Sequence, residues 1–474
     1  MLFTSIIFPF YLAAVLVVYY SLNHKNQNRW LLFVSYFFYG WWDWRFCSLL
    51  AFSTTLDWFV SHALHKSNDS KKRKFFLSLS LVGNLGVLGF FKYFNFFISS
   101  FQQIFQSIGY NNDLYTTSII LPVGISFYTF QTMAYTIDVY RKEQIPANDF
   151  TTFALYVSFF PQLVAGPIER AKRLLPQLML RRDFNYSVIK SGIPLILFGY
   201  FKKVVIADSM SPIVESCFNN YDLVSGPDLL FGTYAFAIQI YCDFSGYTDI
   251  ARGISIFLGI NLINNFSAPY FSLNITEFWR RWHISLSFWL RDYLYISLGG
   301  NRRGRLRTYL NLMLTMILGG LWHGAAWTFV FWGMLHGFYL SLHKFIIESK
   351  ILDFDIWSNK IGSVIRDYFK IIFTFHIVCF SWIFFRSPTL DVAINYIVGI
   401  LSNVGDLSIF KPVFIGGLSI ILIDIGQRKS ENFLWLNEMP IFLRYIIGSS
   451  LLVSSILVFG WHYGTPTPFI YFQF

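Results

Sequence analysis

The sequence predicts an all-α polytopic membrane protein, because of its composition, its recurring apolar runs and the places where its charges fall. Of the 474 residues, 55% are hydrophobic and only 13% are charged, whereas about 25% of an ordinary soluble domain is charged. The mean hydropathy is +0.48. With 15 Trp, 28 Tyr and 55 Phe, the chain carries more aromatic surface than a soluble fold can cover. A water-soluble globule is therefore excluded.

Apolar runs of membrane-crossing length recur from one end of the chain to the other, separated by short polar segments. A crossing helix needs about 20 mainly apolar residues. Several runs are too short or too polar for an ordinary crossing, so we expect roughly ten to twelve transmembrane helices together with re-entrant or interfacial helices. Because there is no long hydrophilic stretch, residues 1–474 are expected to form a single membrane-embedded domain.

The positive charge of the chain indicates its topology and not a nucleic-acid partner. The formal net charge is +11, and the basic residues gather in short loops beside apolar runs, such as 66–74, 170–182 and 302–307. Cytoplasmic loops of membrane proteins are marked in this way. The connections at 219–228 and 402–410 carry no Lys or Arg, and counting the crossings between the two kinds of loop places both termini on the extracytoplasmic side.

The cysteines and histidines give no sign of a metal site or a disulfide framework. The four cysteines are scattered among apolar neighbours with no paired spacing. His62 and His65 have a spacing that a metal can use, but no third ligand is evident in the sequence. We therefore expect no metal and no permanently bound cofactor.

The segment 274–304 combines arginines, tryptophans and a histidine: NITEFWRRWHISLSFWLRDYLYISLGGNRRG. On one continuous helix, Trp279, His283 and Leu290 share a face, and Arg281 and Asp292 lie on the other side. One interpretation is an amphipathic helix at the cytoplasmic interface, which the residue pattern alone favours. The other is a re-entrant wall of a polar pocket that contains His283.

A second histidine, His323, lies between glycines in the segment GGLWHG (319–324). We expect the chain to turn at 319–324, between spans at 308–323 and 325–343. Glycines permit a helix break or a close approach of backbones, and irregular backbone survives in a bilayer only beside protein or a water-filled cavity. An imidazole there is suited to act as a general base. The alternative is a histidine that is hydrogen-bonded within the helix bundle.

Two further features are weaker candidates. His336 lies in GMLHG (333–337), a small-xxx-small spacing whose simplest meaning is close helix packing. The turn that carries Arg302, Arg303 and Arg305 has the charge to hold the phosphates of a donor, although anchoring of the membrane topology explains the same charges.

Several blocks, taken together, resemble the membrane-bound O-acyltransferases. They are closest to the alginate O-acetyltransferase type and more distantly similar to the D-alanyl transfer protein of teichoic acid. The resemblance runs in order from about residue 121 to 474, and residues 1–120 are less diagnostic. The blocks are LPVGISFYTFQTMAYTIDVYR (121–141), SFFPQLVAGPIER (158–170), LLPQL (174–178), YCDFSGYTDIARGISIFLGI (241–260), FWRRWHISLSFWLRDYLYISLGGNRRG (278–304), NLMLTMILGGLWHGAAWTFVFWGMLHG (311–337) and FIYFQF (469–474).

The resemblance implies that His323 is catalytic and that His283 is a supporting or second active residue. It also implies a helical fold around a central tunnel or funnel, with an acyl donor arriving from the cytoplasm, so His323 must be accessible from both aqueous sides. We expect the surrounding polar and aromatic residues to support the pocket, namely Trp279, Arg280, Arg281, Trp282, Asp292, Trp322 and His336. Acetyl-CoA or a related acyl thioester is the expected co-substrate.

The predicted function is transfer of an acetyl group across a bacterial inner membrane, where the chain contacts membrane lipid. The acceptor is an extracytoplasmic polysaccharide, reached directly or through an accessory periplasmic acyltransferase. Two alternatives remain open at this point. One is D-alanyl transfer to teichoic acid, and the other is a transporter or scaffold that exports a polymer or a lipid-linked sugar without acyltransferase chemistry.

Overall fold

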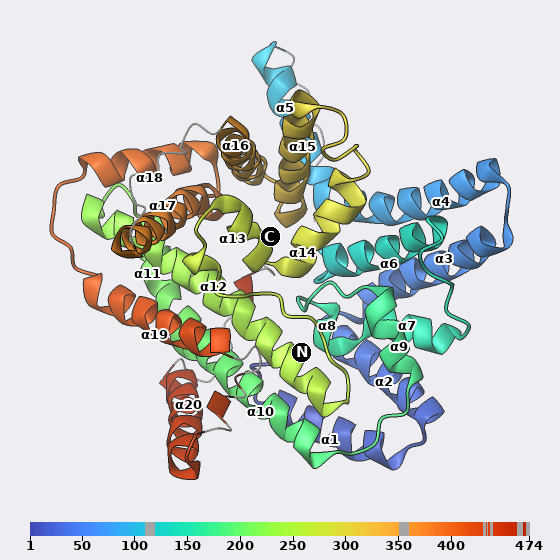
Figure 1. The fold of residues 1–474 in the computed structure, drawn as a ribbon. Helices are drawn as coiled ribbons and strands as arrows, with labels where there is room; N and C mark the ends of the chain where they lie inside the picture. Colours follow the sequence, from blue (N-terminus) through green and yellow to red (C-terminus); the bar gives the residue numbers. More distant parts are fainter. Residues whose placement is uncertain are drawn as a thin grey trace. The chain divides into compact units, whose positions relative to one another are not determined.

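The computed structural model describes residues 1–109, 119–349, 360–429, 433, 435–436, 439–461 and 468–470, and the regular elements in these ranges are all helical (Figure 1). The prediction of an all-α protein is confirmed. By internal contacts the chain divides into two compact units. The first comprises Met1–Gly192 with Ala251–Ile263, and the second comprises Ile193–Ile250 with Asn264–Phe474. Two helices, α10 (Tyr186–Tyr200) and α12 (Gly226–Phe257), contribute residues to both units.

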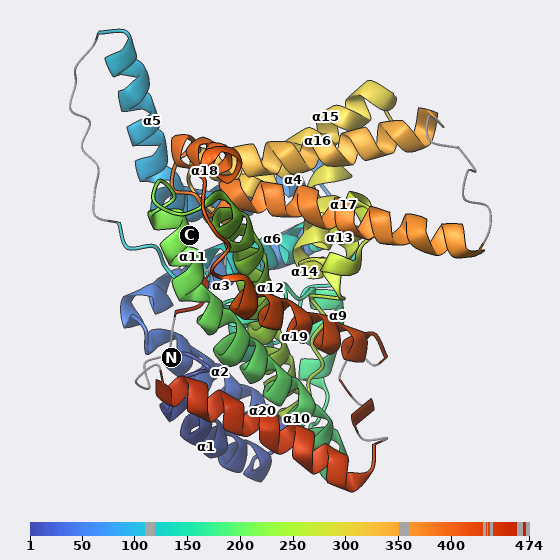
Figure 2. The same ribbon diagram turned by 90° about the vertical axis from the view of Figure 1, so that its left-hand side faces the viewer.

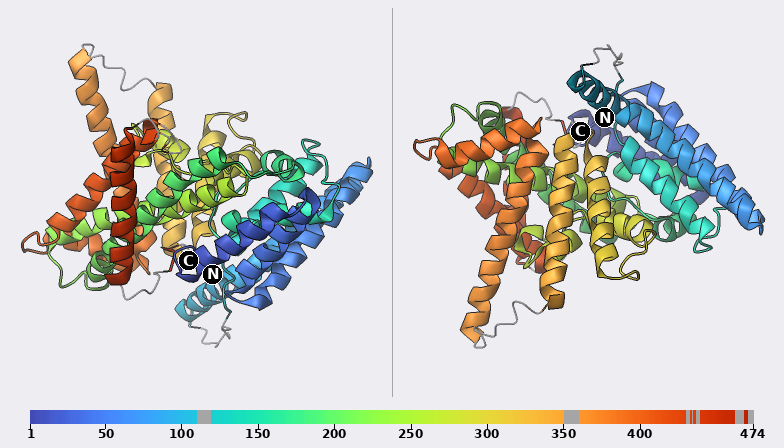
Figure 3. Two further views of the ribbon diagram at one scale, coloured as in Figure 1. Left: turned by 90° about the horizontal axis from the view of Figure 1, so that it is seen from below. Right: turned by 90° about the horizontal axis from the view of Figure 1, so that it is seen from above.

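Helices of the first unit begin where a polar side chain satisfies a free backbone N–H. The side chains of Asn23, Asp69 and Asp149 each accept a hydrogen bond from a backbone N–H in the first turn of α2, α4 and α7. The view from above in Figure 3 shows α4 beside α6. The helices of this unit are α1 (Ile7–Ser21), α2 (His24–Gly40), α3 (Cys47–Lys66), α4 (Ser70–Leu88), α5 (Phe94–Ser107), α6 (Ile125–Tyr140), α7 (Phe150–Ser158), α8 (Phe160–Leu163) and α9 (Ala171–Met179).

A buried carboxylate connects three helices of the first unit. Asp57 of α3 is fully buried. It accepts hydrogen bonds from Asn84 Nδ2 at 2.8 Å, from Thr136 Oγ1 at 3.0 Å and from the Ser80 hydroxyl. Hydrogen bonds between apolar helices fix their rotation, because each partner is costly to leave unsatisfied inside a membrane.

The second unit contains the two segments that carry His283 and His323. Figure 2 shows α15, α16 and α17 lying side by side. The helices of this unit are α11 (Asp208–Asn219), α13 (Ile275–Arg281), α14 (Ile284–Trp289), α15 (Arg305–His323), α16 (Trp327–Ser349), α17 (Lys360–Arg386), α18 (Leu390–Ser402), α19 (Phe410–Lys429) and α20 (Ile441–Trp461), with π-helical turns at η3 (Phe201–Ala207) and η5 (Leu290–Tyr295).

Several helical stretches are long and apolar enough to cross a membrane. By length and composition these are Ser70–Ser107, Gly362–Arg386, Phe410–Arg428 and Ile441–Gly460, with shorter apolar helices at Ile7–Ser21 and Leu390–Ser402. The chain is therefore a multi-pass membrane protein. The number of crossings, the orientation of the termini and the single-domain organisation stay predictions.

Candidate active site

The turn that carries His323 lies later in the chain than expected. Helix α15 continues through Gly319 and Gly320 and ends at His323, and α16 begins at Trp327. The glycines do not break the helix. A Cβ on Gly320 would lie 2.1 Å from the carbonyl oxygen of Phe329, so the missing side chain lets α16 pack directly against α15.

The small-xxx-small spacing on α16 has the packing role that was predicted for it. A Cβ on Gly333 would lie 2.3 Å from the Met316 carbonyl oxygen, and one on Gly337 would lie 3.0 Å from the Met313 Cα atom. Both glycines therefore face α15 at backbone contact. The pair α15–α16 is a rigid support for the histidine at the end of α15.

The His323 side chain lies among aromatic rings and is 4% exposed. Its ring centroid is 5.1 Å from that of Trp332, 5.3 Å from Phe385 and 5.0 Å from Trp322. Such packing holds the imidazole in one orientation. Access to this ring from two aqueous compartments stays a prediction.

His283 lies at a break in the chain, and the expectation of one continuous helix through this segment is wrong. Helix α13 ends at Arg281 and α14 begins at Ile284, and His283 has φ 42° and ψ 56°. A left-handed conformation is uncommon for a residue with a side chain and is found mainly where surrounding contacts impose it. The face shared by Trp279, His283 and Leu290 therefore does not exist, and His283 is fully buried.

Asn265 orients the His283 ring. The Asn265 Oδ1 atom accepts a hydrogen bond from the backbone N–H of Ser285 at 3.1 Å, and it lies 3.3 Å from His283 Nδ1. Because a backbone N–H can only donate, the atom that it meets must be the amide oxygen. His283 Nδ1 is then the protonated nitrogen, and Nε2 carries the lone pair of the neutral ring.

The structure brings the two predicted histidines together. The ring centroids of His283 and His323 lie 6.4 Å apart, and that of Trp322 is 5.9 Å from His283. Phe244 of α12 packs against His283, with ring centroids 4.7 Å apart. Residues 40 positions apart in sequence thus form one buried cluster. A pair of imidazoles at this distance can act on neighbouring atoms of one reacting group.

His336 lies near this cluster but is fully hydrogen-bonded to protein groups. Trp279 Nε1 donates to His336 Nδ1 at 3.2 Å, and His336 Nε2 lies 2.9 Å from the Ser381 hydroxyl. An indole N–H can only donate, so Nδ1 is unprotonated and Nε2–H donates to Ser381. His336 therefore positions the Trp279 side chain.

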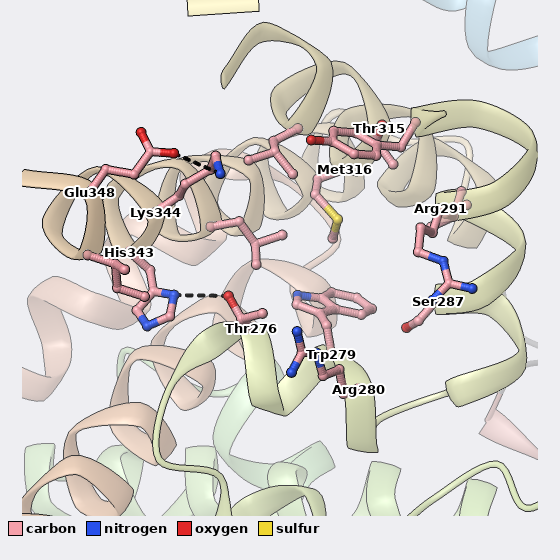
Figure 4. A pocket seen from close by; sticks show the side chains of 15 residues that line it. Thr276, Trp279, Arg280, Ser287, Arg291, Thr315, Met316, His343, Lys344 and Glu348 are labelled. Atoms are coloured by element: carbon pink, nitrogen blue, oxygen red, sulfur yellow. Dashed lines mark hydrogen bonds and ion pairs between the residues drawn. The ribbon is translucent and has the colours of Figure 1, made fainter. Parts of the chain in front are cut away.

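A cavity of about 470 Å³ lies beside Trp279, between the 276–295 segment and the pair α15–α16 (Figure 4). Trp279 of α13 and Met316 of α15 lie on facing sides of it. Its lining combines apolar side chains with hydroxyl groups, one histidine and several charged side chains. The lining residues are Thr276, Trp279, Arg280, Ser287, Leu290, Arg291, Tyr295, Leu312, Thr315, Met316, Leu340, His343, Lys344, Ile347 and Glu348.

The cavity lies along the face of α15 that also carries His323. Met316 lines it, and His323 is seven residues further along the same helix, which is about two turns and nearly the same face. Leu290, another lining residue, packs on Gly319, which lies between Met316 and His323 on α15. A Cβ atom on Gly319 would lie 3.0 Å from the Leu290 Cδ1 atom. His323 is not among the residues that line the cavity.

The structure separates the predicted charged residues by role. Arg280 lines the cavity, whereas Arg281 is paired with Glu277 at 2.6 Å and Asp292 with Arg291 at 2.6 Å. In the basic turn, Arg305 Nε lies 3.5 Å from Glu348 Oε2, at the edge of the cavity. Arg302 and Arg303 are exposed and are not part of the lining. Trp282 is buried against Trp382, with centroids 5.1 Å apart.

Two contributions to the site were missed by the sequence analysis. Asn265 gave no signal, because it lies in an irregular segment 18 residues before His283. Near the end of the chain, Phe469 packs on Phe244, with centroids 5.6 Å apart, and the Ile470 N–H donates to Asp243 Oδ2 at 2.7 Å. The closing block 469–474 was noticed as a motif, but residues 471–474 lie outside the described ranges.

A helical membrane fold with two clustered histidines beside an apolar cavity is suited to transfer of an acyl group between two substrates. The sequence profile described as "MBOAT, membrane-bound O-acyltransferase family" matches residues 76–381. The chain belongs to this family, and it is a multi-pass membrane acyltransferase. Both histidines and the cavity lie within the matched residues.

Relatives with curated descriptions agree with this class. The chain is 42% identical over 395 residues, which are 83% of this chain and 76% of the relative, to the "Probable alginate O-acetylase AlgI" of Azotobacter vinelandii. It is 35% identical over 505 residues, 96% of this chain and 93% of the relative, to the "Peptidoglycan O-acetyltransferase" of Helicobacter pylori. It is 29% identical over 296 residues, 57% of this chain and 70% of the relative, to the "Teichoic acid D-alanyltransferase" of Bacillus subtilis.

Proposed function

We propose that the chain moves an acetyl group from a cytoplasmic acyl thioester, with acetyl-CoA as the donor, to a hydroxyl group of an extracytoplasmic polysaccharide. The acceptor class is taken from relatives that are described as acetylating alginate or peptidoglycan. The observation that carries the proposal is the pairing of His283 and His323, whose ring centroids lie 6.4 Å apart, about two helical turns along α15 from the cavity-lining residue Met316.

The donor enters by the cavity beside Trp279. Arg280, Arg291 and Lys344 line the cavity from different sides, as Figure 4 shows, and cations of this kind suit phosphate groups. Lys344 is hydrogen-bonded to Glu348 at 2.9 Å, and this contact lowers the pKa of the Glu348 carboxyl, which stays ionised at neutral pH. Leu290 and Met316 provide an apolar path for the acyl arm towards His323.

In the chemical step, His323 is the general base. Its neutral imidazole takes the proton of the acceptor hydroxyl while the oxygen attacks the thioester carbonyl carbon. The C–S bond then breaks, and the proton passes to the departing thiolate sulfur. The position of His323 at the carboxyl end of α15 favours this step, because the helix dipole stabilises positive charge there. The neutral His283 ring, oriented by Asn265, supports the site as a hydrogen-bond acceptor, because its Nε2 atom carries the lone pair.

The experiment that tests this proposal replaces His323. We expect His323→Ala to insert and fold normally while ester-linked acetate on the surface glycan falls about 10²-fold or more, the usual contribution of a general base. His65→Ala, at an exposed position near the end of α3, is the matched control and should keep full activity. Unchanged alkali-releasable acetate in His323→Ala would contradict the catalytic assignment. If His323→Ala still exports the polymer but no longer acetylates it, the chain is an enzyme that is not needed for export.

The donor, the moved group and the accessory protein need separate measurements. Membrane vesicles given radiolabelled acetyl-CoA on the cytoplasmic face should transfer label to added polysaccharide, and label supplied on the other face should not. Mass spectrometry of the product distinguishes acetyl from D-alanyl esters. Transfer that requires a soluble periplasmic fraction indicates an accessory acyltransferase, and transfer without it indicates a direct reaction.

A further inference from the structure

A second cavity lies between α16 and α17 and adjoins the first along α16, where His343 and Ile347 line both cavities. Its volume is about 630 Å³. Phe338, Leu342 and Ile346 line it, whereas Leu340, Lys344 and Glu348 line the first cavity. From the two shared residues, the cavities extend over adjoining faces of α16. We call the second cavity the α16–α17 groove. It is lined by Leu273, Asn274, Ile275, Phe338, Tyr339, Leu342, His343, Ile346, Ile347, Arg366, Lys370, Phe373, Thr374 and Ile377.

One end of the α16–α17 groove is basic. Arg366 and Lys370 are four residues apart, so they lie on one face of α17. Among the described residues that line the groove, none is acidic. The Nε atom of Arg366 is buried without a hydrogen-bond partner in the described part of the chain, and its ion pair with Asp367 is long, at 3.8 Å. The Arg366 side chain as a whole is 41% exposed, so its guanidinium is accessible to an anionic oxygen.

The rest of the groove is apolar and open to the side. From Arg366 to Ile377 the helix rises through eleven residues, about 16 Å, which is close to half of the roughly 30 Å hydrocarbon core of a bilayer. Phe338 and Phe373 are 53% and 67% exposed. In a multi-pass protein such rings face lipid, so an acyl chain reaches the groove from within the membrane.

We propose that the α16–α17 groove binds one anionic phospholipid. Its phosphate lies between Arg366 and Lys370, and one acyl chain follows Leu342, Phe373 and Ile377. The acyl donor is a poorer occupant, because neither Trp279 nor Met316, which mark the route towards His323, lines this groove. The site adjoins the donor cavity at His343 and Ile347 but lies off the route past Trp279 and Met316 towards His323. The lipid stabilises the pairing of α16 with α17.

The test measures retention of phosphatidylglycerol by the purified full-length chain, using native mass spectrometry and titration in phosphatidylcholine nanodiscs. We expect the native chain to hold one phosphatidylglycerol. The double variant Arg366→Gln/Lys370→Gln should bind it about 30-fold more weakly, because each basic side chain contributes to the attraction of an anionic headgroup. The charge-preserving variant Arg366→Lys/Lys370→Arg should bind as the native chain does. Lys190→Gln removes an exposed positive charge elsewhere and serves as the matched control.

The results that would overturn the proposal are equally specific. One is a phosphatidylglycerol affinity in the double variant within twofold of the native value. Another is that the native chain retains phosphatidylcholine equally well. The third is displacement of phosphatidylglycerol by acetyl-CoA, which would make the groove a donor site. If the double variant fails to fold, Lys370→Gln alone, at an exposed position, still tests the site. A loss of affinity of at least threefold supports the site, and no loss opposes it. Acetyl transfer by these variants reports on the catalytic proposal independently.

Discussion

At the scale of single residues, the site depends on groups that hold the histidines in place. His283 has a strained backbone and a ring whose protonated nitrogen is set by Asn265. The same Asn265 oxygen also accepts from the Ser285 N–H and hydroxyl, at 3.1 and 3.0 Å. One amide oxygen thus satisfies several buried donors, and its loss affects both the fold and the chemistry.

Asn265→Ala is expected to lower the stability of the protein by about 2 kcal/mol or more, because buried donors lose their acceptor. Acetyl transfer should fall at the same time, since the His283 ring loses its fixed orientation. Asn265→Asp keeps an acceptor oxygen and should retain more of both properties. Thermal unfolding in detergent and the transfer assay measure the two effects, and an Asn265→Ala protein with native stability and activity would remove Asn265 from the site.

Glu169 provides a prediction about pH. It lies in the loop before α9, and burial raises the pKa of its carboxyl from 4.5 to about 7. Its Oε1 accepts from the Ile263 N–H at 2.5 Å, and the Arg173 guanidinium lies 3.8 Å away. Because the pKa is higher in the folded chain than in the unfolded chain, the folded chain binds the proton more tightly.

The contribution of Glu169 to stability is therefore fully present below pH 4.5 and is lost as the pH rises to about 7. The difference is at most about 3 kcal/mol. Glu169→Gln imitates the protonated acid, so its unfolding temperature should change less between pH 4.5 and 7.5 than that of the native protein. If the unfolding temperatures of the native protein and of Glu169→Gln change with pH in the same way, the pKa of Glu169 is not raised by folding.

At the scale of helices, the α15–α16 pair is built on glycines that allow backbone contact. Gly320→Ala should destabilise the protein by about 1–3 kcal/mol, because the new methyl group meets the Phe329 backbone and the helices must separate. Gly86→Ala on α4 is the control, since nothing lies within 4 Å of its Cβ position. That change should be neutral or stabilising by about 0.5 kcal/mol. Equal unfolding temperatures for the two variants would argue against backbone contact at Gly320.

The helix boundaries near the site were the least predictable part of the fold. Nothing in WRRWHIS indicates a break, because the left-handed conformation of His283 comes from the Asn265 contact and not from a local Gly or Pro. In GGLWHG the glycines were available for a turn, but Gly320 packs on the Phe329 backbone of α16 and the helix continues through Gly319 and Gly320. Local sequence shows which conformations are permitted, and the tertiary partner decides between them.

At the scale of the whole molecule, composition and charge were sufficient to predict a helical membrane protein, because no other fold class buries so many apolar residues. The cavity was not predictable. Its walls come from 276–295, from α15 and from α16, and their side chains meet only after the helices have packed. The ion pairs of Lys203 in η3 were not predictable either, because its partners come together only in the folded chain. Lys203 pairs with Asp208 at 2.9 Å and with Asp243 of α12.

The predicted orientation can be tested with single cysteines. In a Cys47→Ala background, which removes the one cysteine among the four that is not buried, we expect Val404→Cys to react with a membrane-impermeant maleimide outside the cytoplasmic membrane. Val404 is fully exposed. Arg302→Cys, in the basic turn, should react only after the membrane is broken, because loops rich in Lys and Arg stay in the cytoplasm. The opposite labelling pattern would invert the topology and with it the donor side.

The π-helical turn η5 makes the donor cavity sensitive to chain length. A π-helical turn accommodates one residue more than an α-helical turn in the same place, and Leu290, Arg291 and Tyr295 of this turn all line the cavity. Deletion of a single residue from it would restore ordinary winding and rotate the following side chains by about 100°. Tyr295 would then leave the cavity wall, and the basic turn that follows would be rotated relative to the cavity. Substitutions in this segment should therefore be tolerated far better than deletions.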